Sequence, residues 1–149
     1  MIRRVAAALA VLVAAGTVVV AVGLGQGSPP HSTRLSPAQR AQEIKAIANA
    51  GPAVMRGRGL FASHGCGACH TIASANANGK LGPELDAILP GVPPAAIEQF
   101  ITHPPAQYPP FQTKLMPRNF GDRLSSRDIK SLATFIAAAA NAAHGKSGS

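Results

Sequence analysis

Five consecutive residues carry the most specific chemistry in the sequence: Cys66-Gly67-Ala68-Cys69-His70. In a C-x-x-C-H motif the two thiols are spaced to form thioethers with the two vinyl groups of one haem, and the histidine that follows reaches its iron. The motif therefore predicts one covalent haem c, held by Cys66 and Cys69, with His70 as the proximal iron ligand.

Two other kinds of site also use a C-x-x-C pair. A thiol–disulfide redox pair normally begins a helix within a βαβ unit, which the sequence does not indicate. A zinc site needs four ligands, and no second Cys/His pair lies at a suitable spacing to complete Cys66 and Cys69. Haem attachment is the interpretation that we favour.

The N-terminus carries an export signal. Residues 5–25 contain no charge, and as a helix they would be about 30 Å long, which is close to the thickness of the bilayer hydrocarbon. Arg3 and Arg4 precede them and favour a cytoplasmic N-terminus. We expect residues 1–25 to be a single-pass anchor in the cell membrane, with the remainder on the outer, periplasmic or extracytoplasmic side. The alternative is a cleaved signal peptide, which would leave a periplasmic or secreted protein.

The rest of the chain predicts an all-α fold with long loops. Residues 26–51 are expected to be a linker with a short helix from Pro37, whose narrow apolar stripe is Ala41, Ile44, Ile47 and Ala48. That helix is either a spacer or packed on the following domain. We expect a folded domain over residues 52–145 and a disordered tail over residues 146–149.

Within residues 52–145 three helices are expected, and none of the rest has a convincing strand pattern. The helices cover residues 52–63, residues 94–102 and a C-terminal segment that Ser125 caps. Residues 71–89 and 104–117 read as irregular, and loops of that length usually wrap something. A bound haem would also explain how so small a domain forms a core when only 4% of the residues are aromatic.

From Pro52 to His144 the chain resembles class I monohaem cytochromes c of the membrane-anchored bacterial type. The family has a glycine and an aromatic on the helix before the haem motif, here Gly57 and Phe61, which cross the C-terminal helix at Phe135. The resemblance implies the cytochrome c fold, a small helical domain with long loops around its haem. Leu81-Gly82-Pro83 is similar to the family segment whose proline carbonyl accepts a hydrogen bond from the proximal histidine, which implies this role for Pro83.

The distal iron ligand that the resemblance implies is Met116, in the proline-rich loop before the last helix. Met1 lies in the export segment, and Met55 lies on the helix that enters the haem motif. His103 is a rival ligand, which would lower the redox potential relative to methionine.

With both axial positions filled, the resemblance implies an electron carrier in a respiratory chain that is not itself an enzyme. The alternatives are a haem-bearing subunit of a larger membrane oxidoreductase (an oxidase or a dehydrogenase) or a haem sensor with a labile sixth ligand. We expect redox proteins to dock at an exposed haem edge. The chain has a net charge of +8, but residues 52–144 carry only eight Lys or Arg against five Asp or Glu. Because no nucleic-acid motif accompanies this charge, we expect no nucleic-acid partner.

Overall fold

The computed structural model describes residues 34–105 and 115–145. The predicted anchor or signal segment (1–25), the first part of the linker and the tail (146–149) lie outside the described residues. Among the residues that are described, no helix is both long enough and apolar enough to span a bilayer.

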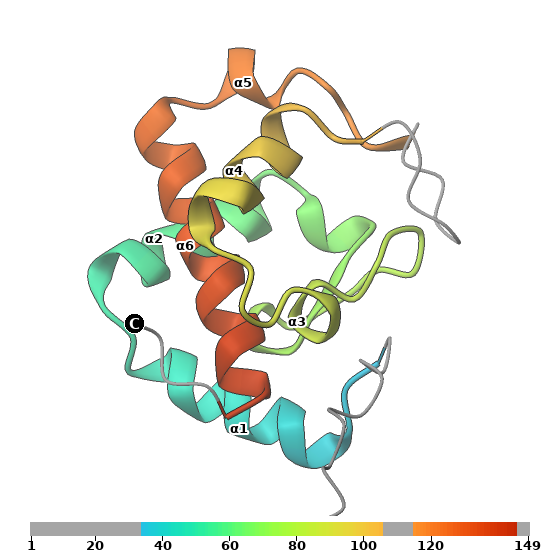
Figure 1. Ribbon diagram of the computed structural model, residues 1–149, viewed down its shortest axis with the longest axis vertical. Coiled ribbons are helices and arrows are strands. Elements are labelled where there is room, and N and C mark those ends of the chain that lie inside the picture. The colour runs from blue at the N-terminus through green and yellow to red at the C-terminus, as the bar shows by residue number, and fades with distance from the viewer. Residues whose placement is uncertain (1–33, 106–114, 146–149) are drawn as a thin grey trace, which may run out of the picture.

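The described part of the chain is mainly helical, as the sequence predicts. The long C-terminal helix lies at its centre, and other helices pack around it (Figure 1). The α-helices are α1 (Pro37–Ala48), α2 (Pro52–Ser63), α3 (Leu85–Ile88), α4 (Pro94–Thr102), α5 (Phe120–Arg123) and α6 (Ser126–Ala143). Helices α1, α2, α3 and α4 all contact α6, and α6 contributes more of the buried apolar residues than any other described helix.

The segment after the C-x-x-C-H motif is more regular than the sequence indicates. The motif itself forms the 3₁₀ turn η1 (Cys66–Ala68), and the segment after it contains the 3₁₀ turn η2 (Ala73–Ala75) and strands β1 (Thr71–Ile72) and β2 (Ala77–Asn78). The two strands pair antiparallel, with Thr71 opposite Asn78. The expectation of no strands was therefore wrong here, because two-residue strands are too short to show an alternating pattern. The single-turn helices α3 and α5 escaped prediction for the same reason.

The predicted crossing of α2 and α6 is confirmed. A Cβ atom built on Gly57 would lie 2.0 Å from the Ser131 carbonyl oxygen and 2.7 Å from the Phe135 Cβ, so only glycine allows this approach. Beside it the rings of Phe61 and Phe135 meet edge to face, with their centroids 5.8 Å apart. Both rings are almost fully buried.

Serine residues cap the first and last helices. Ser36 and Gln39 form a reciprocal capping box at the start of α1. At α6 the Ser125 hydroxyl accepts a hydrogen bond from the Asp128 backbone N–H and donates one to the Asp128 carboxylate. That carboxylate also binds Arg56, which ties the N-terminal half of α2 to the first turn of α6.

Helix α1 packs against α6 and η2, which is one of the two alternatives considered for it. Its buried residues are Glu43 and Ile47, while Ile44 of the expected apolar stripe is half exposed. Ala41 and Ala48 are exposed as well, so the expected stripe was right only at Ile47, and the Glu43 carboxyl group lies inside. These contacts make α1 part of the same packed unit as the residues from Pro52 onward.

Candidate functional site

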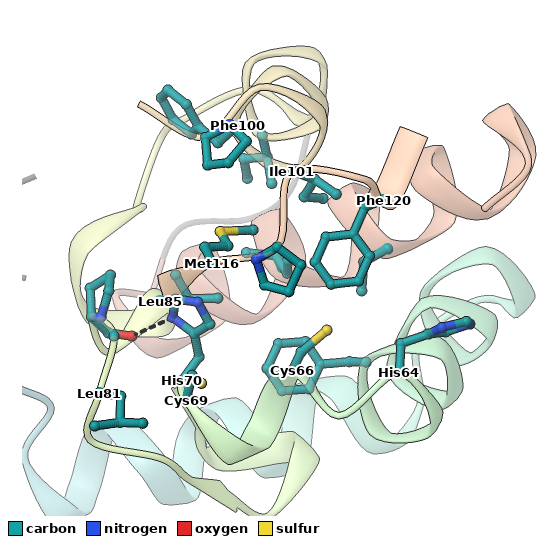
Figure 2. A pocket seen from close by; sticks show the side chains of 18 of the residues that line it. His64, Cys66, Cys69, His70, Leu81, Leu85, Phe100, Ile101, Met116 and Phe120 are labelled. Carbon is teal, nitrogen blue, oxygen red and sulfur yellow. Dashed lines mark hydrogen bonds between the residues drawn. The ribbon is translucent and has the colours of Figure 1, made fainter. Parts of the chain in front are cut away.

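A cavity of about 310 Å³ opens beside α6, and the side chains that the motif singled out meet there. Cys66, Cys69, His70 and Met116 line it, from two segments about 50 residues apart in the chain (Figure 2). The other lining side chains are largely apolar, among them Phe61, Leu85, Ile97, Ile101, Phe120, Leu132 and Ile136. Its size and lining are those of a site for an apolar ligand with a few polar anchors.

A single tight turn presents the thiols and the imidazole. The backbone N–H groups of Cys69 and His70 both donate to the Cys66 carbonyl, at 3.2 and 3.0 Å. Both cysteines are half-buried free thiols, so no disulfide joins them. Burial raises the pKa of the Cys66 thiol, which keeps it protonated.

The hydrogen bond expected between His70 and Pro83 is present. His70 Nδ1 lies 3.0 Å from the Pro83 carbonyl oxygen. A carbonyl only accepts, so the proton sits on Nδ1 and the Nε2 lone pair stays free to bind a metal. Burial lowers the pKa of His70, and the Pro83 carbonyl partly opposes that shift. Both the tautomer and the neutral charge therefore suit an iron ligand.

Two glycines, to which the motif gives no role, allow the segment after His70 to pack closely against the C-x-x-C-H turn. A Cβ on Gly82 would lie 2.6 Å from His70 Cε1, and one on Gly79 would lie 2.4 Å from the Cys69 carbonyl carbon. Their N–H groups donate back to the carbonyls of Cys69 and His70, respectively. Spacing alone does not show such a contact, because it depends on how the loop folds back.

Met116 is the candidate distal ligand that the structure places at the cavity. It is half-buried there and packs against the apolar core. His103 is exposed, lies outside the lining and has its Nδ1 2.9 Å from the Thr102 hydroxyl. Met55 is also exposed, on α2. Of these three, the geometry favours Met116.

The residues present fit a haem. Two thiols three positions apart, a neutral imidazole and a thioether share one cavity, and its lining is otherwise largely apolar. Leu81, Phe100 and Leu115 also line this cavity and are 61%, 44% and 61% exposed, so its mouth is apolar as well. Arg118 and Arg123 are exposed near the Met116 segment.

Comparison with known families agrees with this site. Residues 52–136 match the family described as cytochrome C oxidase, cbb3-type, subunit III. Neither a curated protein nor a solved structure matches the chain. The match covers more than half of the chain and spans α2 to the middle of α6, including the C-x-x-C-H turn. The chain belongs to this family, and its matched region is a c-type cytochrome domain, which implies a haem c.

Proposed function

We propose that the protein is an electron carrier of a respiratory chain, which transfers one electron at a time through one covalent haem c. The observation that carries the proposal is the convergence of Cys66, Cys69, His70 and Met116 on one apolar cavity. When bound, the haem supplies the Fe(III)/Fe(II) couple.

Each of these residues has a distinct part. The Cys66 and Cys69 thiols hold the group covalently, and the Pro83 carbonyl orients His70 through its Nδ1 proton. Met116 offers a soft thioether, and together with the apolar lining it favours the reduced state. His70 and Met116 would both hold the haem iron and would leave no ligand position for a substrate, so we propose a carrier that is not itself an enzyme.

A second candidate function is that of a haem-bearing subunit held in a larger oxidoreductase. The description of the matched family as an oxidase subunit favours it. In either role we propose that a redox partner (an oxidase, a reductase or a dehydrogenase) docks at the apolar cavity mouth. The exposed Arg118 and Arg123 would favour an acidic docking site. Purification in mild detergent separates the two roles, because stoichiometric co-isolation with an enzyme would contradict the free carrier.

We also propose that the protein lies at the cell membrane, with the haem domain on the outer side. The support is the uncharged run over residues 5–25, with Arg3 and Arg4 before it. The mass of the mature protein tests this, since loss of the first 25 or so residues would mean a cleaved signal and a periplasmic or secreted product.

The test of the cofactor is a pyridine haemochrome assay on denatured protein, with Cys66→Ser and Cys69→Ser as variants. We expect one haem per chain that stays attached after denaturation, and weaker attachment in each variant. Absence of covalent haem would overturn the proposal. Carbon monoxide binding to the reduced native protein at neutral pH would support the sensor alternative instead.

A further inference from the structure

Two carboxyl groups lie wholly buried between α1 and the segments next to His70. Glu43 of α1 and Asp86 of α3 each have 0% of their surface exposed. Glu43 Oε1 accepts the backbone N–H of Ser74 and Asp86 Oδ2 accepts that of Ala73, both at 2.8 Å. Among the described residues no other donor reaches Glu43 Oε2 or Asp86 Oδ1, and the two carboxyls contact each other.

The charged groups around this pair do not neutralise it. On α1, Arg40 forms an ion pair with Glu84, and Lys45 is exposed. Glu84 also accepts a hydrogen bond from the Leu35 backbone N–H. From η2 only the polar side chain of Ser74 approaches, and after α6 the buried Nε2 of His144 has no hydrogen-bond partner. No cation is among the groups that shift the pKa of Glu43.

Two carboxylates in contact cannot both ionise cheaply in a buried site. One proton shared between the Glu43 and Asp86 carboxyls removes one charge and makes a hydrogen bond between two groups that each have one oxygen without a partner. Burial and the contact with Asp86 raise the pKa of Glu43 to about 8, although hydrogen bonds from Ser74 oppose the shift. The geometry and the electrostatics thus both favour a protonated Glu43.

We propose that Glu43 and Asp86 form a proton-sharing acid pair that fastens α1 to η2 and α3, and so positions the two segments on either side of the His70–Pro83 hydrogen bond. Ala73 and Ser74 follow His70 by three and four residues, and Asp86 follows Pro83 by three. The part of this inference that concerns His70 rests on the proposed function, while the acid pair itself does not.

The sign of the pH effect follows from linkage. The folded protein keeps a proton that the unfolded chain releases above pH 4.5. Stability should therefore fall as the pH rises from 4.5 to about 8, with the unfolding constant rising by up to tenfold per pH unit, and then level off. Glu43→Gln replaces the shared proton with a permanent amide donor and should remove this dependence.

The first experiment is ¹³C NMR of the carboxyl carbons in reduced holoprotein. The chain has only six acidic residues, so signals lost in Glu43→Gln and Asp86→Asn are readily assigned. We expect the Glu43 signal to titrate near pH 8, so that Glu43 still holds its proton at pH 6. Asp122→Asn, an exposed acid on α5, is the control and should leave both signals unchanged. The proposal would be overturned if both carboxylates were ionised at pH 6, as they would be around a bound cation. The wild-type spectrum is enough to decide this, so the outcome does not depend on whether the variants fold.

The second experiment measures urea unfolding and the midpoint potential of the holoprotein from pH 5 to 9. Relative to wild type, Glu43→Gln should gain stability as the pH rises, and its potential should lose a pH-dependent step, while Asp122→Asn follows wild type. Parallel potential profiles in wild type and Glu43→Gln would overturn the link to His70. If the chain carried no haem but Glu43 still titrated near pH 8, the proposed function would be contradicted and the acid pair would stand.

Discussion

Substitution by alanine at two glycines of α2 should change the stability of the protein in opposite directions. Gly57 and Gly59 both lie inside α2, two residues apart. In Gly57→Ala the new methyl would meet the Ser131 carbonyl at 2.0 Å, so α2 and α6 must separate by about 1.4 Å to restore ordinary contact. In Gly59→Ala the methyl meets nothing within 4 Å.

The expected magnitudes follow from these distances. Overpacking of this kind costs about 1–3 kcal/mol, and the better helix propensity of alanine returns only about 0.5–1 kcal/mol. Gly57→Ala should thus lose on the order of 1–2 kcal/mol of unfolding free energy or more. Gly59→Ala has only the propensity effect and should gain about 0.5–1 kcal/mol.

Urea unfolding of the two holoproteins, followed by far-UV circular dichroism, measures both changes against wild type. A covalent haem stays on the unfolded chain, so its dissociation does not complicate the comparison. The reasoning would be refuted if Gly57→Ala were as stable as Gly59→Ala, because the close crossing of α2 and α6 would then impose no constraint.

Three further changes test other contacts. Gly82→Ala should displace the His70 imidazole and shift the midpoint potential, because the new Cβ would lie 2.7 Å from His70 Nδ1. Gly121→Ala is the control, since its Cβ would have no atom nearer than 3.8 Å, and should leave the potential unchanged. Equal potentials in the two variants would show that the approach of Gly82 to His70 does not matter. Ser125→Ala should cost about 1 kcal/mol in urea unfolding, because α6 loses its cap; an unchanged midpoint would argue against the cap. Ser125 and Arg56 lower the pKa of Asp128, so this carboxylate stabilises the fold above its ordinary pKa and loses that effect as the pH falls. Arg56→Ala should weaken this acid dependence in thermal melts from pH 3 to 6, and an identical dependence would refute it.

The sequence predicts those parts of the molecule whose signal is local. Helices α2 and α6 are long enough to show their apolar faces, Pro52 marks the start of α2 and Ser125 that of α6, and the haem motif is contiguous. The hydrogen bond between His70 and Pro83 was within reach only through the family resemblance, because nothing in a Gly-Pro pair by itself indicates its partner.

The parts that escaped prediction depend on contacts between distant segments. Nothing near Glu43 in the sequence shows that it is buried against Ser74, 31 residues away, or beside Asp86. The pairing of Arg40 with Glu84 is equally remote. Amphipathic patterning favours an exposed carboxylate on α1, and only the assembled fold supplies the backbone donors that hold it inside.

The far-red sulfur–iron charge-transfer band of the oxidised protein tests the central claim most directly, since it requires a haem with Met116 on its iron. We predict that the band is present in wild type, persists in Met55→Ala and His103→Ala, and is absent in Met116→Ala. A band that survives in Met116→Ala, or none in wild type, would contradict the account.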